Sequence, residues 1–341
     1  MSCNKSVNIF LLGLASGMTT DIRTSNQNQQ ILMTFAYAFS VTLMVTVSII
    51  SNIISIDTFR QKTIRTTTTG LCLLIYSCCS LFGIIMLECR LFQFIDSLTY
   101  LPFFIVCNLI SGLTVVFTRL CLWLNGLIAL QRALHSFEHN RFLNKIRSQT
   151  IVSKQICFII IIVFLMHIHE FICRVTSPDP VAPNKFVCQI LYSQELLMLN
   201  QIFSFTHLFV PFSLHIISTC LIIASISRRR AMLYQTTYWK QWFKQFRCHH
   251  HLFLAPILAM ICTLPQLILS LKYSCVDVSL KWLLRLNTSA NLIIYIPQSM
   301  TFFLFIYHSG SFWDTFKKQS ILGKRFCSKQ NTVAPIVKTA S

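Results

Sequence analysis

Long apolar stretches alternate with short polar segments along most of the chain, and this pattern sets the first expectation for the fold. A helix needs about 20 mostly apolar residues to cross the hydrocarbon core of a membrane. Backbone N–H and C=O groups find no water there, so each crossing segment must satisfy them internally as a helix. The pattern predicts an all-α membrane protein, a seven-transmembrane helix bundle, with helices over residues 31–56, 70–88, 103–131, 155–173, 199–227, 252–272 and 284–308.

Charged residues fall mainly between these stretches. Residues 31–56, 199–227 and 252–271 contain no Lys, Arg, Asp or Glu, and the third stretch contains only Arg119. The seventh stretch is the least regular, because polar or charged residues interrupt it at Arg285, Asn287, Asn291 and Gln298.

The composition supports a membrane protein over a soluble one. Only 11% of the residues are charged and 54% are hydrophobic, whereas soluble globular proteins carry about a quarter charged residues. A net charge of +19 would suggest nucleic-acid binding in a soluble protein. Here the basic residues lie between apolar stretches, so no nucleic-acid partner is expected. The 15 cysteines show no paired CxxC zinc spacing, and neither a metal nor a cofactor is expected.

The distribution of basic residues predicts the orientation of the bundle. On one side of the seven stretches lie 20 Lys and Arg residues, and on the other lie 8. Because cytoplasmic loops carry the excess of Lys and Arg, the N-terminus is expected outside and the C-terminus inside. Asn4, in the tripeptide Asn4-Lys5-Ser6, is a candidate glycosylation site on the outer side.

Segments at the two ends of the bundle complete the predicted organisation. Residues 1–30 form an extracellular tail, 31–308 the bundle, and 309–341 an amphipathic helix and cytoplasmic tail. Within the first segment, residues 7–18 fit either a weak signal-peptide pattern or a flexible or interfacial tail, and the second is favoured.

The amphipathic helix is predicted from Phe312 and Phe316, which share a helical face, and from the lysines that follow. Such a helix is attracted to anionic membrane lipid. Cys327 beyond it is a candidate palmitoylation site or a free cytosolic thiol.

Several residues at particular places in these stretches point to one family. The third stretch ends in Leu130-Gln131-Arg132-Ala133, with Cys107 placed 25 residues before the arginine. The fifth contains Pro211, and the sixth contains Cys262-Thr263-Leu264-Pro265. Together with Cys188 between stretches four and five, this set resembles the rhodopsin-like (class A) G-protein-coupled receptors. A chemoreceptor-like or peptide-receptor-like member of the invertebrate kind is the narrower resemblance.

The resemblance implies roles for these residues. Cys107 and Cys188 would form a disulfide across the mouth of the ligand pocket, and Gln131 and Arg132 would take part in G-protein coupling. Pro211, Cys262 and Pro265 would form kinks used in activation. The implied partners are an extracellular ligand, peptide or small molecule, and a heterotrimeric G protein, and the implied location is the plasma membrane.

Departures from the family pattern narrow the expectations further. Family members often carry an acid at the position of Gln131, and this acid holds the arginine in the resting state. Because the acid is missing here, we expect a weakly held resting state and measurable basal activity. Thr114 stands where amine receptors carry an Asp, so an amine ligand is not expected. Ser80 follows two cysteines where the family usually has an Asp, and Pro297 lacks the usual Asn-Pro-x-x-Tyr context.

Two residues of the third stretch are candidates for the ligand pocket, Thr114 and Arg119. Arg119 lies 13 residues before Arg132, about 20 Å along a helix. A charged residue at this depth is expensive and is a functional candidate by default. Arg119 would orient an anionic or carbonyl-bearing ligand, or it would be a structural arginine bonded to carbonyls or water.

Two other classes of protein remain as alternatives. A seven-helix transporter or channel would show an internal repeat with broken helices in both halves, whereas the prolines here cluster in the second half. A membrane enzyme is not expected, since no HExxH, GxSxG or clustered acid pair occurs. The run Cys248-His249-His250-His251 fits a solvated loop better than a metal site.

Overall fold

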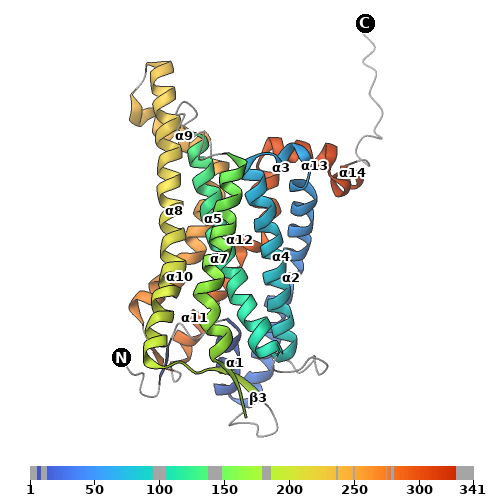
Figure 1. Ribbon diagram of the computed structural model, residues 1–341, viewed down its shortest axis with the longest axis vertical. Coiled ribbons are helices and arrows are strands. Elements are labelled where there is room, and N and C mark those ends of the chain that lie inside the picture. The colour runs from blue at the N-terminus through green and yellow to red at the C-terminus, as the bar shows by residue number, and fades with distance from the viewer. Residues whose placement is uncertain are drawn as a thin grey trace.

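A computed structural model describes residues 6–8, 14–94, 105–136, 148–178, 186–235, 237–248, 250–273, 275–277 and 280–327. The described chain is an elongated bundle of helices that run along its long axis (Figure 1). One end carries two short pairs of antiparallel strands, and we call it the disulfide end. The opposite end carries the helices after residue 309 and is called the basic end.

Five helices are long and apolar enough to cross a membrane, within the part of the chain that the structure describes. They are α2 (Gln27–Phe59), α4 (Thr68–Phe94), α5 (Ser111–His135) with its preceding π-helical segment η1 (Ile105–Ile110), α7 (Gln149–Cys173) and α8 (Gln194–Tyr234). They coincide with the first five predicted stretches and confirm an all-α membrane fold.

The outward faces of these helices are apolar. Phe35 on α2, Phe158 on α7 and Ile172 on α7 are 69%, 64% and 73% exposed. Large contiguous apolar surface of this kind is unfavourable in water and is covered by partners or by membrane. The chain is therefore embedded in a membrane, and lipid tails cover these side chains.

The sixth stretch forms one helix, and the seventh does not. The sixth becomes α10 (His250–Lys272), which agrees with the predicted stretch 252–272. The seventh does not form one continuous helix as predicted. It is divided into α11 (Lys281–Ile293), α12 (Ile296–Ser299) and the π-helical segment η2 (Phe302–Tyr307). Pro297 follows this interruption, and its missing N–H removes one helical hydrogen bond.

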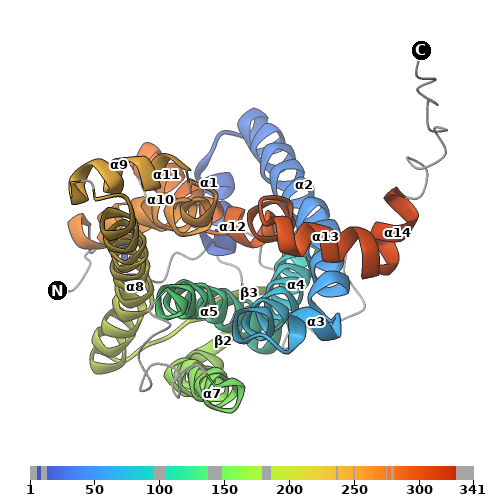
Figure 2. The same cartoon turned by 90° about the horizontal axis from the view of Figure 1, so that it is seen from above.

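The long helices form a ring when viewed along the bundle (Figure 2). α2 packs on α4, α4 on α5, α5 on α8, α8 on α10 and α10 on α11, and α12 closes the ring against α2. α7 lies outside this ring and packs chiefly against α5. The helix α5 is consequently the most enclosed, which places its side chains among residues from several helices.

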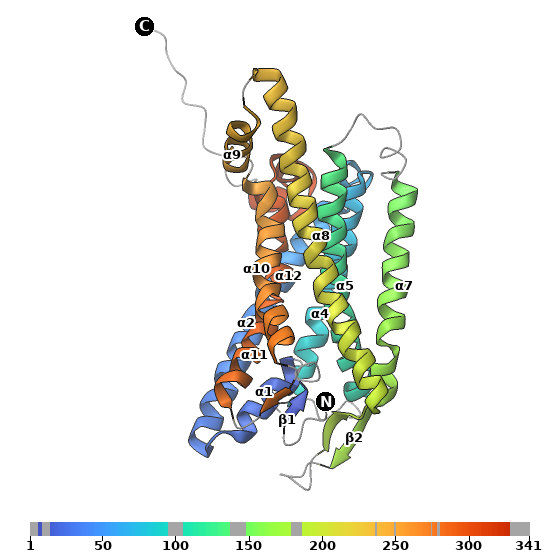
Figure 3. The ribbon, with the colours of Figure 1, turned by 90° about the vertical axis from the view of Figure 1, so that its left-hand side faces the viewer.

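Strands and a short helix cover the disulfide end (Figure 3). β2 (Arg174–Pro178) pairs antiparallel with β3 (Phe186–Ile190), and β1 (Ser6–Asn8) pairs antiparallel with β4 (Cys275–Asp277). The helix α1 (Leu14–Thr24) packs against α11 and α2. This part of residues 1–30 differs from the flexible or interfacial tail that the sequence favoured, because its apolar side chains are buried in the bundle.

Helix α1 approaches its neighbour closely at Gly17. A Cβ atom there would lie 2.6 Å from the Thr288 hydroxyl oxygen on α11. Asp21 on the same helix is fully buried, and its carboxylate accepts a hydrogen bond from the Tyr37 hydroxyl and pairs with Arg285. Both contacts fix α1 to the bundle.

Short helices lie across the basic end: α3 (Lys62–Arg65), α9 (Tyr238–Cys248), α13 (Gly310–Gln319) and α14 (Ile321–Cys327). α13 follows the bundle as predicted, with Phe316 buried and Lys317 lying 4.9 Å from the Trp313 ring centroid. The Asp57 carboxylate at the end of α2 accepts hydrogen bonds from the Ser320 hydroxyl and the Leu322 N–H. These bonds fasten the junction of α13 and α14 to α2.

Candidate functional sites

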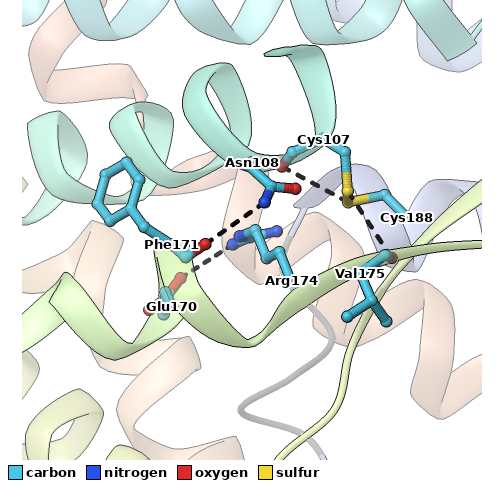
Figure 4. The surroundings of a disulfide bond; sticks show 7 residues. All are labelled: Cys107, Asn108, Glu170, Phe171, Arg174, Val175 and Cys188. Carbon is cyan, nitrogen blue, oxygen red and sulfur yellow. Dashed lines mark hydrogen bonds and ion pairs between the residues drawn. A yellow bond between two sulfur atoms is a disulfide. The ribbon is translucent and has the colours of Figure 1, made fainter. Parts of the chain in front are cut away.

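The disulfide Cys107–Cys188 joins the β2–β3 hairpin to η1 at the start of α5. The two Cα atoms are 5.4 Å apart, within the normal range for a disulfide. Cys188 belongs to β3 and stands opposite Thr176 of β2. The predicted pairing of these two cysteines is confirmed, and the bond holds the hairpin over this end of the bundle (Figure 4).

A buried ionic group lies where α7 leads into β2. Glu170 pairs through one carboxylate oxygen with the Arg174 guanidinium and through the other with His167 Nδ1, each at 2.9 Å. Figure 4 shows Glu170 and Arg174 beside the disulfide. The i,i+4 spacing of Glu170 and Arg174 allows this pair on one helical face. All three side chains are nearly inaccessible to solvent.

The ionic group continues across α8 and α5. The His167 and His207 rings stack with their centroids 4.7 Å apart. Trp123 Nε1 on α5 donates a hydrogen bond of 2.8 Å to His207 Nδ1. His207 lies four residues before Pro211, so its carbonyl loses the helical N–H that any other residue at 211 would supply. The site is thus built at the proline of α8.

Three arginines interact electrostatically with Glu170, and Arg174 is the one in direct contact with it. Arg119 on α5 lies within electrostatic range of Glu170 and of Tyr295, one of the two residues between α11 and α12. Arg90 on α4 lies within range of Glu170, Arg174 and Tyr295. Thr118 donates a hydrogen bond of 3.1 Å to the Tyr295 hydroxyl, which fixes the ring beside α5. We call this group of side chains the arginine cluster; it comprises Arg90, Arg119, His167, Glu170, Arg174, His207 and Tyr295.

The sequence pointed to one member of this cluster, Arg119, and missed most of the others. Thr114, the second pocket candidate, bonds within its own helix and is not a member of the cluster. Its buried hydroxyl donates to the Ile110 carbonyl of its own helix, 2.8 Å away. That hydroxyl is therefore already satisfied by the backbone.

The predicted coupling pair lies at the basic end of α5. The Arg132 guanidinium carbon lies 5.2 Å from the centroid of the Phe305 ring on η2. Among the residues described, no carboxylate forms an ion pair with Arg132. Gln131 is buried and donates to the Gln155 side-chain oxygen on α7 at 3.1 Å, so its amide is engaged with α7.

The end of α5 is also bonded to α8. The Ser136 carbonyl accepts a hydrogen bond of 2.8 Å from the Ser225 hydroxyl, and it accepts a second from the Arg229 guanidinium. These bonds fasten the end of α5, one turn after Arg132, to the basic extension of α8.

The predicted kink residues lie inside α8 and α10. Pro211 is buried within α8, and Pro265 lies within α10, one turn after the buried Cys262. The other two candidates cannot be placed: Asn4 lies outside the described residues, and only the backbone of Cys327 is described, at the end of α14. In the described part of the chain, no group of His, Cys, Asp and Glu side chains is arranged to hold a metal ion.

Fold and sites together define an all-α, membrane-embedded protein with a disulfide-tethered hairpin at one end. No protein-family model matches the chain, and no curated protein matches it significantly.

Proposed function

We propose that this chain is a rhodopsin-like G-protein-coupled receptor of the plasma membrane. In this proposal α10 and the segments from α11 to η2 supply the sixth and seventh crossings, with the disulfide end outside and the basic end inside. The receptor binds an extracellular ligand near the disulfide end and activates a heterotrimeric G protein at the basic end.

The observation that carries the proposal is the environment of Arg132. An arginine that is partly buried at the end of a membrane helix needs either a partner or access to the interface. Here its described partner is the face of Phe305, a contact worth about 0.5–2 kcal/mol. Such a weakly held guanidinium can exchange partners when the helices around it move, which a G protein could use.

The link between the two ends runs through α5. The same helix carries Arg119 in the arginine cluster and Arg132 at the basic end. A ligand shifts a bundle only if it binds one arrangement better than another. The prolines of α8 and α10 weaken the helices next to α5 and allow a second arrangement.

Basal signalling in cells with a promiscuous G protein tests the function. We expect the wild type to signal above mock-transfected cells, and Arg132→Ala to fall to the mock level at equal surface expression. Arg65→Ala is the matched control, because Arg65 is exposed at the same end on α3. Gln131→Glu restores the acid that members of this family often carry before the arginine, and it should lower the basal level. Wild-type signalling equal to mock, or unaffected by Arg132→Ala, would contradict the proposal.

A further inference from the structure

We propose that the arginine cluster binds the anionic group of an organic ligand, a carboxylate in the simplest case, through the guanidiniums of Arg90 and Arg119. The inference rests on the proposed function only in treating this ligand as a signal. The binding of an anion at this place is argued from the described side chains themselves.

The cluster contains more positive than negative charge. Arg90, Arg119 and Arg174 are three guanidiniums, which stay protonated in proteins. Glu170 is the only carboxylate of the cluster, and Arg174 and His167 already occupy both of its oxygens. Within the described chain, Arg90 and Arg119 take part in no ion pair. Two guanidiniums are therefore left without a counter-charge.

The hydrogen bond from Trp123 shows that His207 contributes a further hydrogen-bond donor and no negative charge. The Trp123 N–H is a donor only, so His207 Nδ1 must accept its hydrogen bond and carry no proton. The ring is then neutral, with its proton on Nε2. That Nε2 atom is buried and has no partner in the described structure. A free N–H thus adds to the two free guanidiniums.

Other buried polar atoms around Glu170 are also unsatisfied. Arg174 Nε and the Tyr192 hydroxyl have no hydrogen-bond partner among the described residues. Tyr192 lies within electrostatic range of Glu170 and Arg174. Buried polar groups are normally hydrogen-bonded, and each exception calls for an explanation. His167 Nε2 is likewise buried without a partner among the described residues. Arg174 Nε, the Tyr192 hydroxyl and His207 Nε2 all carry a hydrogen to donate, so the group that complements them is a hydrogen-bond acceptor.

Charge decides which acceptor fits. A neutral carbonyl or a water molecule would satisfy donors but would leave the excess charge inside the membrane, where an uncompensated charge is costly. An anion satisfies both requirements, and the planar guanidinium matches a carboxylate with two parallel hydrogen bonds. Arg90 and Arg119 are only partly buried, whereas Glu170 and His207 are buried. The two unpaired arginines are accordingly the more accessible of the charged side chains in the cluster.

The surroundings favour an anion with an apolar body. The Tyr295 ring lies near both Arg90 and Arg119, and Trp123 packs edge-on against His207. Binding sites of small molecules combine aromatic walls with a few polar groups that fix orientation. An inorganic anion would leave these aromatic faces unused.

Thermal unfolding of the purified full-length protein in detergent tests the inference. The probes are acetate, hexanoate and decanoate, each compared with its neutral amide at the same concentration and ionic strength. A ligand that binds the folded state raises the unfolding temperature saturably. We expect at least one carboxylate to stabilise the wild type more than its amide does. Arg90→Gln and Arg119→Gln should each weaken its apparent affinity by about tenfold or more.

Matched variants separate loss of the site from loss of the fold. Arg65→Gln at the basic end should keep the wild-type response. If Arg119→Gln does not fold, Arg119→Lys retains the charge but removes the guanidinium fork, and it should bind the carboxylate more weakly. The inference is overturned if no carboxylate exceeds its amide, or if the arginine variants respond as the wild type does.

These results are independent of the signalling assay. Carboxylate binding that depends on Arg90 and Arg119, in a protein without basal signalling, would keep the anion site and reject the receptor. Signalling that depends on Arg132, in a protein that does not distinguish carboxylates from amides, would keep the receptor and reject the anion site.

Discussion

Asn52 connects three helices through a single side chain near the C-terminal end of α2. Its Nδ2 group donates to the Ser48 carbonyl, the Ser80 hydroxyl on α4 and the Gln298 carbonyl on α12. Its Oδ1 atom accepts from the Thr301 hydroxyl at 3.1 Å. Asn52 is fully buried. Because water cannot replace these bonds, the amide positions the interrupted seventh segment against α2 and α4.

Replacing Asn52 with alanine should lower the free energy of unfolding by on the order of 1–3 kcal/mol, since buried groups on α4 and α12 lose one of their donors and the Thr301 hydroxyl loses an acceptor. Thermal unfolding in detergent measures this change. Asn26→Ala is the control, because Asn26 is exposed and its side chain makes no capping hydrogen bond. An equal unfolding temperature for the Asn52 variant and the wild type would mean that the amide does not hold the helices together.

Some residues of the candidate sites could be predicted from the sequence, and others could not. Cys107 and Cys188 were found by resemblance, and their pairing is present. Arg119 was found because a charge inside an apolar stretch is conspicuous. Its neighbours His207 and Tyr295 were not found, since a histidine or tyrosine in such a stretch is common. Only the packing of α5, α8 and the α11–α12 junction brings these residues together.

At the scale of elements, hydropathy located the membrane part of each helix but not its ends. α8 continues through Arg228 to Tyr234, beyond the apolar stretch that ends at residue 227. Hydrophobicity marks where lipid ends, whereas a helix can continue into water on hydrogen bonds of its own backbone. The opposite error occurred in the seventh stretch, which reads as one segment but is interrupted at Ile294 and Tyr295.

Helix α1 is the element that the sequence described least well. It is too short and too polar to stand out, and its position depends on partners far along the chain. The Asp21 carboxylate is fully buried and bonded to Tyr37 and Arg285. Replacing the Asp21 carboxylate with an amide removes the ion pair that joins α1 to Arg285 on α11. The attachment of α1 should therefore depend on Asp21.

We expect Asp21→Asn to release α1 from the bundle. Trypsin should then cut after the exposed Arg23 several times faster than in the wild type, because local opening governs cleavage of a folded segment. Mass spectrometry of timed digests measures the rate at this bond. Asp314→Asn, an exposed substitution on α13, should leave it unchanged. Equal cleavage rates for Asp21→Asn and the wild type would show that the ion pair does not retain α1.

At the scale of the whole molecule, the structure gives the bundle two chemically different ends. The disulfide, the hairpin β2–β3 and α1 lie together at one end, and α3, α9 and α13 lie at the other. These segments lie at the ends to which the count of Lys and Arg residues assigned them. Which end faces the cell exterior stays a prediction, because it depends on the positive-inside rule.

Glycosylation can test that orientation with single substitutions. The enzyme that attaches glycans to Asn-x-Ser/Thr acts only outside the cytoplasm, so a modified site marks the outer side. Phe186→Thr in β3 converts Asn184-Lys185-Phe186 into an acceptor at the disulfide end. Val333→Thr does the same for Asn331-Thr332-Val333 in the C-terminal segment. Both are made in an Asn4→Gln background, which removes the natural acceptor.

In that background we expect Phe186→Thr to acquire a glycan and Val333→Thr to acquire none. A glycosidase-sensitive shift on a gel is the measurement. The tripeptide Asn287-Thr288-Ser289 also fits the acceptor pattern, but Asn287 is buried in α11 and should stay unmodified. If only the Val333→Thr protein acquired a glycan, the predicted orientation would be wrong and the basic end would face the cell exterior. That orientation would place Arg132 outside the cell, where no G protein could reach it.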